Sequence, residues 1–338
     1  MSTVAPLRRP ITLLGTGHAL PQRAVLSSEL DVQLGYATGT IARKSGVRSR
    51  YVAALSDTAA SLAAQAAKRA LRAAGLQLSD IDCLVAASGT MDQGMPCNAA
   101  LIHHELGLSD SGIPAFDVNA SCLGFLAALD TLSWAMMGGR YRCVLIVAAD
   151  MASCGLDWSV LESSAIFGDG AAAAVVSLAD ESAPSALLSA NLRTYSSGVD
   201  LCKIPAGGTR YHPTRIQQPF EPLAKFKMDG KGVFKLALVH LPDFVAQLLA
   251  QAGITAAQLD WIVPHQASHL ALAHLTKRLG FPVEKVINIF AEHGNQVAAS
   301  LPTALDIAIR DGRIQRGQRV LLLGTGAGLS IGGIVLVF

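Results

Sequence analysis

Short apolar runs alternate with longer amphipathic segments along this chain. The spacing of apolar residues over Asp57–Ala74 predicts a helix that is capped by Ser56 or Asp57 and stopped by Gly75. A second helix is predicted over Cys122–Met137, because Gly138 and Gly139 follow it. Apolar runs predict strands at Ile81–Ala87, Pro114–Val118, Arg142–Ala149, Trp261–Val263, Val320–Leu323 and Ile331–Phe338. This order favours a layered α/β fold with right-handed crossovers.

The second half of the chain repeats the plan of the first. Gly75 and Gly253 each precede a strand by a few residues, at an offset of 178 (253 − 75). Gly139-Arg140 and Gly312-Arg313 also precede strands, at an offset of 173 (312 − 139). These offsets predict an internal duplication, with chance similarity of two α/β stretches as the alternative. A duplication places matching loops of the two halves face to face, where we expect a functional site.

Composition narrows the class of protein. The chain has 338 residues, 51% hydrophobic and 15% charged, which disfavours disorder, coiled coils and charged tails. A net charge of +2 gives no electrostatic argument for nucleic-acid binding. No apolar run reaches the ~18 residues of a membrane span, and no apolar signal-peptide region follows Met1–Pro10. We therefore expect a cytoplasmic protein with reduced thiols and no membrane partner.

One of the six cysteines stands out from the others. No pair has CxxC spacing, and Cys83 and Cys143 lie in apolar strand patterns as small core residues. Cys122 instead follows the strand-to-helix turn that contains Asn119, Ala120 and Ser121. A helix start predicts a lowered thiol pKa, and small neighbours permit a sharp turn, which suits a nucleophile. A buried, inert cysteine is the alternative reading.

Two loops of the second half carry a histidine and an asparagine, and the one with the asparagine matches the Cys122 turn. His265 follows the strand Trp261–Val263, at the carboxyl end where α/β sheets bind ligands. Asn295 lies 173 residues after Cys122 (295 − 122), the offset of the Gly-Arg pairs, which predicts equivalent positions. A thiol, an imidazole and an amide that converge form a covalent acyl-transfer site.

Two rival interpretations of these loops are weaker. His265, His269 and His274 suggest a metal site, but neither an HExxH motif nor an acidic third ligand accompanies them. The run Gly324–Gly328 suggests a phosphate loop, but the strand-like run Ile331–Phe338 follows it rather than a helix. A tight glycine hairpin that allows close approach of the backbone to a ligand is the better explanation.

From about Ile11 to Phe338, the sequence resembles the β-ketoacyl-ACP synthase III enzymes of the thiolase superfamily. The motifs that carry the resemblance occur in order: Ser45–Arg48, Asn119–Cys122, Phe167–Ala171, Val263–Ala267, His293–Asn295 and Asp311–Arg313. The resemblance implies a duplicated five-layer α/β/α/β/α fold and a homodimer. Its N-terminal half (1–175) would carry the cysteine, and its C-terminal half (176–338) the histidine and asparagine.

The resemblance also implies roles for individual residues. Cys122 would accept an acyl group from a thioester, while His265 and Asn295 would stabilise the enolate formed when malonyl-ACP loses carbon dioxide. The backbone N–H groups of Cys122 and Ala327 would form an oxyanion hole. No cofactor or metal is implied; the substrates would be acyl-CoA or acyl-ACP and malonyl-ACP.

Pocket and docking residues are implied in the same way. Met95 and Leu329 match acyl-pocket positions, and Met95 would enter the pocket of a dimer partner. The flexible Met95 thioether would admit a longer or branched acyl chain. Lys235, Lys277 and Arg278 match basic residues that dock the acyl carrier protein, although ordinary solvated charges are the alternative. Thr40 and Leu161 stand where relatives stack the coenzyme A adenine between a tryptophan and an arginine.

The sequence thus predicts a decarboxylating Claisen condensation in fatty acid or related secondary-metabolite biosynthesis. Acyl transfer from Cys122 to a non-malonyl acceptor is the first alternative, and retention of both His265 and Asn295 argues against it. A non-catalytic subunit of the same fold is the second alternative. It would not need Cys122 in the matched turn.

Overall fold

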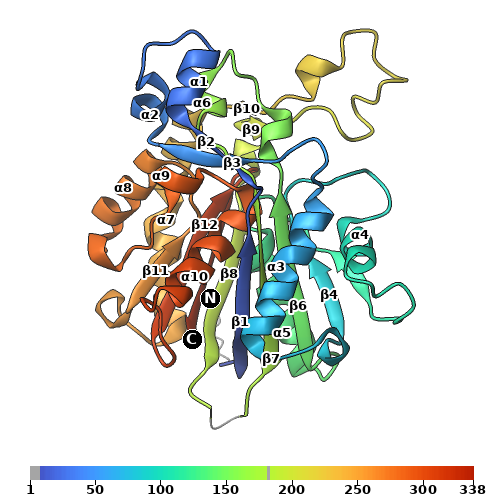
Figure 1. The fold of residues 1–338 in the computed structure, drawn as a ribbon. Helices are drawn as coiled ribbons and strands as arrows, with labels where there is room; N and C mark the ends of the chain where they lie inside the picture. The colour runs from blue at the N-terminus through green and yellow to red at the C-terminus, as the bar shows by residue number, and fades with distance from the viewer. Residues whose placement is uncertain (1–7, 181–182) are drawn as a thin grey trace.

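The computed structural model describes residues 8–180 and 183–338 as two stacked sheets with helices between and outside them (Figure 1). Up to residue 178 the elements are β1 (Ile11–Ala19), β2 (Arg23–Leu26), α1 (Ser27–Gln33), α2 (Thr40–Ser45), β3 (Ser49–Val52), α3 (Ala59–Ala74), β4 (Cys83–Ala86), α4 (Asn98–Glu105), β5 (Ala115–Asp117), α5 (Gly124–Met137), β6 (Cys143–Asp150), α6 (Leu161–Ser164) and β7 (Gly170–Leu178), and of these β2 and β3 pair in a small separate sheet. The remaining elements are β8 (Ala186–Thr194), β9 (Cys202–Lys203), β10 (Lys227–Met228), α7 (Gly230–Ala252), β11 (Trp261–Pro264), α8 (His269–Leu279), α9 (Phe290–His293), α10 (Ser300–Arg310), β12 (Arg319–Gly326) and β13 (Ser330–Val337).

The two sheets share one topology. The first has the order β1-β7-β6-β4-β5 and the second β8-β13-β12-β11. In both, the first two neighbouring pairs are antiparallel and the third is parallel. A parallel bridge from Ile262 to Val286 stands where the first sheet has β5. The expected duplicated α/β fold is therefore confirmed, and the predicted boundary between residues 175 and 176 falls within β7.

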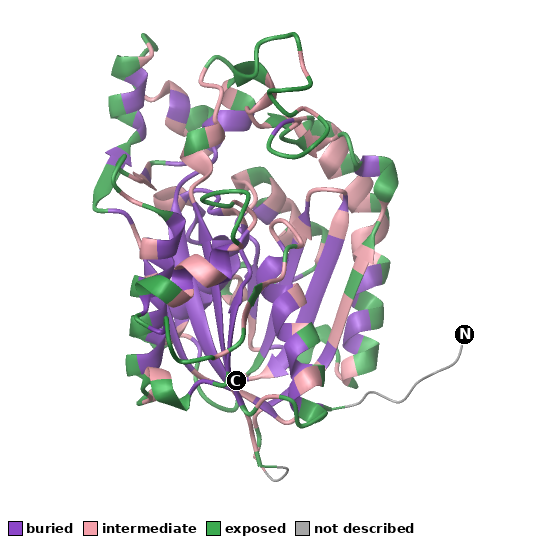
Figure 2. Cartoon of the chain, turned by 90° about the vertical axis from the view of Figure 1, so that its right-hand side faces the viewer, coloured by how far each residue is buried: buried purple, intermediate pink, exposed green. Residues whose placement is uncertain are grey.

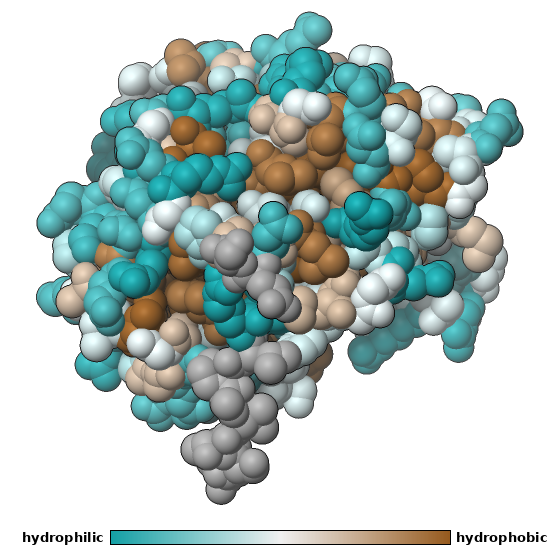
Figure 3. Space-filling model, turned by 90° about the horizontal axis from the view of Figure 1, so that it is seen from below, coloured by the Kyte–Doolittle hydropathy of each residue, from teal (hydrophilic) through white to brown (hydrophobic). Residues whose placement is uncertain are grey.

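Helices separate and cover the sheets in five layers. α5 and α10 each contact both sheets and form the middle layer, whereas α3 and α4 cover the first sheet and α7 covers the second. The core strands are buried along most of their length, and exposed residues concentrate on the outer helices and loops (Figure 2). Hydrophilic residues cover much of the lower end, with apolar residues visible between them (Figure 3).

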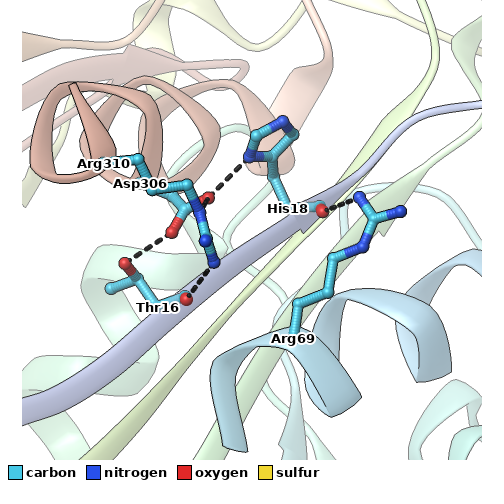
Figure 4. A network of polar contacts seen from close by, with 5 residues as sticks. All are labelled: Thr16, His18, Arg69, Asp306 and Arg310. Carbon is cyan, nitrogen blue, oxygen red and sulfur yellow. Dashed lines mark hydrogen bonds and ion pairs between the residues drawn. The ribbon is translucent and has the colours of Figure 1, made fainter. Parts of the chain in front are cut away.

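A polar network ties the first sheet to the middle layer (Figure 4). The buried Asp306 of α10 accepts a hydrogen bond from Thr16 of β1 at 2.6 Å and contacts His18 Nδ1 at 2.5 Å. Arg310 donates to Asp306 at 2.7 Å, and Arg69 of α3 donates to the His18 carbonyl at 2.6 Å. Burial opposes ionisation of Asp306, yet these hydrogen bonds hold the pKa of its carboxyl below the usual value.

The predicted elements lie within a few residues of their observed positions. The helix predicted over Asp57–Ala74 begins at Ala59, because the Thr58 side chain rather than Ser56 or Asp57 accepts the Ser61 N–H; the predicted cap is wrong. Gly75 ends that helix in the left-handed conformation, as predicted. The predicted strand Val320–Leu323 extends to Arg319–Gly326, since its pairing with β13 continues through the glycines.

The longest helix bears on the membrane prediction. Among the described residues, α7 is long and apolar enough to span a membrane. Its second half packs Phe244, Val245, Leu248 and Leu249 into the core around the second sheet, while most of its apolar window is not buried. The prediction that no signal peptide is present concerned Met1–Pro10, and residues 1–7 of that segment lie outside the described residues.

Candidate active site

One large cavity brings together the chemistry-bearing residues of both halves. It has a volume of about 1800 Å³, and Cys122, His265 and Asn295 all line it. Small-molecule sites usually measure about 300–1,000 Å³, so this cavity has room for a long ligand. The three residues belong to separate loops next to α5, β11 and α9. The sequence therefore identified three side chains that the fold places around one space.

The turn before α5 presents the thiol of Cys122. Ser121 adopts a left-handed conformation with φ of 51°, and its N–H donates to the Asn119 side chain at 2.8 Å. A Cβ on Gly124 would lie 2.2 Å from the Ala87 carbonyl oxygen, so only glycine lets α5 begin this close to the end of β4. This packing fixes the position of Cys122 relative to the first sheet.

The predicted lowering of the Cys122 thiol pKa is wrong. Burial, together with the nearby Asp150 and Cys202, raises the pKa of its thiol to about 12 rather than lowering it. Hydrogen bonds from the backbone N–H groups of Cys122 and Ala327 oppose this shift but do not overcome it. The cysteine is thus a neutral thiol near pH 7, because burial disfavours the charged thiolate.

His265 is rigidly held at the end of β11. The neighbouring Gln266 donates to the carbonyls of Pro264 at 2.8 Å and Ile287 at 3.2 Å, and accepts from the Ile289 N–H at 3.0 Å. Burial lowers the pKa of the His265 imidazole to about 4, so the ring is neutral near pH 7. Its Nδ1 is buried without a hydrogen-bond partner among the described residues, and the residue lines the cavity.

Asn295 is held by its own loop and by the loop that follows His265. Its side-chain oxygen accepts from the Val297 N–H at 2.9 Å, and its Nδ2 donates to the Ala267 carbonyl at 3.3 Å. An amide nitrogen has two protons, so one stays available for a ligand. Val297 is left-handed, with φ of 52°, three residues before α10, as Ser121 is before α5.

The predicted equivalence of Cys122 and Asn295 rests on a sequence offset of 173, which the structure keeps only between the C-terminal ends of α5 and α10. The starts of α5 and α10 differ by 176 residues (300 − 124), not 173. α10 has 11 residues and α5 has 14, which accounts for the difference of three. Asn295 consequently lies before the left-handed residue of its turn, and Cys122 after it.

The glycine hairpin at the end of β12 closes the cavity beside His265. A Cβ on Gly324 would lie 2.9 Å from the His265 Cβ and 2.8 Å from Leu123, so glycine is required there. Ala327 and Leu329 of the following turn both line the cavity. This hairpin brings the Ala327 N–H to the thiol of Cys122, which belongs to the other half.

The remaining predicted residues divide between the cavity and the surface. Leu329 is buried in the cavity wall, but Met95 is 86% exposed and does not line the cavity of its own chain, although Gln93 and Gly94 do. This exposure leaves Met95 free to enter the pocket of a partner, as the resemblance implies, and that role stays a prediction. Lys235 on α7 and Lys277 and Arg278 on α8 are exposed, and Arg278 lies at the rim of the cavity.

The histidines of the rejected metal site have separate partners. His269 Nδ1 lies 2.9 Å from the Ser45 carbonyl oxygen, while the His274 ring packs edge-on against Phe234. Within residues 8–180 and 183–338, no three metal-ligating side chains gather at one point.

Sequence reasoning missed several buried polar residues beneath the site. Asp150 accepts hydrogen bonds from the N–H groups of Gly89, Thr90 and Ala299 and so joins loops of both halves. Burial raises the pKa of its carboxyl to about 6 despite these bonds. Its position directly after the apolar run Arg142–Ala149 was the available signal, since a carboxylate there needs buried donors.

Comparison with known proteins identifies the family. One model, described as 3-oxoacyl-[acyl-carrier-protein] synthase III, matches residues 116–196, and the C-terminal model of the same family matches residues 249–338. A β-ketoacyl-[acyl-carrier-protein] synthase III of Neisseria meningitidis is 37% identical over 324 residues, 96% of this chain and 98% of the relative.

Solved structures agree with this assignment. The crystal structure of 3-oxoacyl-(acyl carrier protein) synthase III from Pseudomonas aeruginosa is 33% identical, with a TM-score of 0.87 over 98% of both chains. A priming β-ketosynthase from a polyketide biosynthetic pathway is 31% identical, with a TM-score of 0.85 over 100% of this chain and 99% of that one.

Proposed function

This chain belongs to the 3-oxoacyl-[acyl-carrier-protein] synthase III family of condensing enzymes, and we propose that Cys122, His265 and Asn295 divide its reaction between them. The observation that carries the proposal is their shared cavity, in which N–H groups of Cys122 and Ala327 point at the thiol. Acylation and decarboxylation each develop negative charge on an oxygen. The two N–H groups would stabilise this charge during acylation, and His265 and Asn295 would do so during decarboxylation.

Acylation comes first. The Cys122 sulfur forms a bond to the carbonyl carbon of an acyl thioester, and the carbonyl oxygen becomes an oxyanion. The N–H groups of Cys122 and Ala327 stabilise this oxyanion, each contributing about 3 kcal/mol. The carbon–sulfur bond to the carrier then breaks, and the thiol proton leaves with the departing thiolate sulfur. Because the Cys122 thiol is neutral before substrate binds, attack and proton transfer are coupled.

Condensation follows on the acyl-enzyme. The bond between the malonyl carboxylate and the adjacent carbon breaks, carbon dioxide leaves, and the electron pair moves onto the thioester carbonyl. Neutral His265 and the free Asn295 N–H donate to the resulting enolate oxygen. The enolate carbon attacks the acyl group, and the Cys122 thiolate departs and takes up a proton.

A load-and-release experiment tests these roles. We expect intact mass spectrometry to show one acyl adduct per chain after incubation with acyl-CoA or acyl-ACP, and no adduct in Cys122→Ala. Cys202→Ala is the matched control, since Cys202 lines the same cavity. Addition of malonyl-ACP then releases carbon dioxide. No adduct with any donor would contradict the proposal, and an adduct without carbon dioxide release would favour transfer to a non-malonyl acceptor.

Carrier binding is assigned to the exposed cations of α7 and α8. Lys235, Lys277 and Arg278 lie on helices whose cavity-facing sides include Phe234 and His274, so an acidic carrier docked there would direct its pantetheine arm inward. Lys235→Glu should raise KM for malonyl-ACP several-fold and leave acylation by acyl-CoA unchanged. Arg72→Glu on α3 is the control charge reversal. An equal loss with both donors would contradict carrier docking.

We also propose a homodimer in which Met95 of one protomer enters the partner's cavity. The support is its 86% exposure directly beyond the cavity-lining Gln93 and Gly94. Met95→Trp should then lower acylation by bulky donors more than acylation by acetyl-CoA. A monomer by light scattering, or equal effects on both donors, would contradict this arrangement. The cytoplasmic location stays a prediction.

A further inference from the structure

A buried arginine lies beneath the loop that holds Asn295. Arg50, on β3, is 1% exposed and pairs with no carboxylate in the described part of the chain. Burial lowers the pKa of its guanidinium to about 10, so the group is still charged near pH 7. Burying an isolated charge costs desolvation free energy, which the interactions of Arg50 must offset.

The guanidinium holds the main chain on both sides of Ile166. Its NH1 donates to the carbonyl of Ala165 and, at 3.3 Å, to the carbonyl of Phe167. Its NH2 donates to the Ser27 hydroxyl at 2.9 Å, which in turn donates to the Val47 carbonyl at 2.6 Å. The planar fork of arginine can hold three such acceptors at once, which a lysine ammonium cannot do in the same geometry.

The carbonyl between those two belongs to Ile166, and it accepts the N–H of Asn295 at 2.7 Å. The Gly168 N–H donates to the Asn295 carbonyl at 3.1 Å, so the segment holds Asn295 from both sides. The two backbones are in direct contact. A Cβ on Gly168 would lie 2.3 Å from the His293 carbonyl oxygen, and one on Gly294 would lie 2.7 Å from the Ile166 carbonyl oxygen. A shift of Ala165–Phe167 therefore moves Asn295.

We propose that Arg50 is a positioning residue for the decarboxylation step. By fixing the carbonyls of Ala165 and Phe167, it holds Ile166 and Gly168 in the register that directs the Asn295 amide toward the malonyl thioester. Arg50 makes no hydrogen bond to the turns that carry Cys122 or His265. Its effect is thus confined to the second half of the reaction. This inference rests on the proposed role of Asn295.

The two half-reactions separate this role from a general structural one. In Arg50→Lys, we expect the rate of Cys122 acylation to stay within about threefold of wild type. Carbon dioxide release should fall about 10- to 100-fold, the effect of a small misplacement of a catalytic group. Arg9→Met is the control, because Arg9 is 3% exposed but binds Asp130 and Ser133 away from the cavity. It should leave the ratio of the two rates unchanged.

A double variant completes the test. If Arg50 acts through Asn295, then Arg50→Lys in the Asn295→Ala background causes no further loss of carbon dioxide release. Additive losses, or equal losses in both half-reactions, would overturn the inference. If wild-type enzyme releases no carbon dioxide, the proposed function itself fails. If Asn295→Ala impairs release and Arg50→Lys does not, only the positioning role fails.

Discussion

The backbone N–H of Ala327 hydrogen-bonds to the Cys122 thiol across 205 positions of sequence (327 − 122). The two residues belong to opposite halves of the duplicated fold. Neither half alone therefore supplies both N–H groups of the proposed oxyanion hole, and the proposal makes the hairpin between β12 and β13 part of the acylation machinery.

Removing this donor should slow acylation selectively. Ala327→Pro lacks the N–H, and we expect the acylation rate to fall about 10²–10³-fold, as for other oxyanion-hole donors. Stopped-flow or quenched acylation measures the rate, and Ala327→Gly, which keeps the N–H, is the control. An unchanged rate in a folded Ala327→Pro enzyme would exclude this N–H from the hole.

His265 and Asn295 should matter in a different step. His265→Ala and Asn295→Ala are expected to acylate Cys122 normally but to release carbon dioxide from malonyl-ACP about 10²–10³-fold more slowly. Single-turnover assays of each half-reaction check this. Loss of acylation in either variant would show that the two donors do not act on the enolate alone.

The pH dependence follows from the raised thiol pKa. Because burial raises the pKa of Cys122 to about 12, its thiolate fraction is small at pH 7 and grows about tenfold per pH unit. Alkylation of Cys122 by iodoacetamide in the free enzyme should accelerate in this way from pH 7 to 10. Peptide mass spectrometry measures the alkylation rate at each pH. A rate that is already at a plateau near pH 7 would mean that the thiol is activated before substrate binds.

The turn before α5 should be intolerant of even one methyl group. Gly124→Ala places a Cβ against the Ala87 carbonyl, and we expect the free energy of unfolding to fall by about 1–3 kcal/mol. Denaturant unfolding measures it. Gly208→Ala is the control, because a Cβ there meets nothing within 4 Å. Equal stability of the two variants would show that the turn can shift.

Much of this site was predictable because its signals are local. Strand runs and stop glycines such as Gly75 predicted the elements, and motif order predicted Cys122, His265 and Asn295. The thiol pKa was not predictable, since it depends on burial by distant segments rather than on the helix start alone. Arg50 and Asp150 were missed for the same reason, because their hydrogen-bond partners lie far away in the sequence.

The most direct measurement follows the acyl group itself. Enzyme that carries a labelled acyl group on Cys122, freed of excess donor, is mixed with malonyl-ACP. We predict that the label leaves the protein and appears in β-ketoacyl-ACP in a 1:1 ratio with released carbon dioxide. Label that stays on Cys122 while carbon dioxide is released, or that leaves only as free acid, would contradict a condensation through this cysteine.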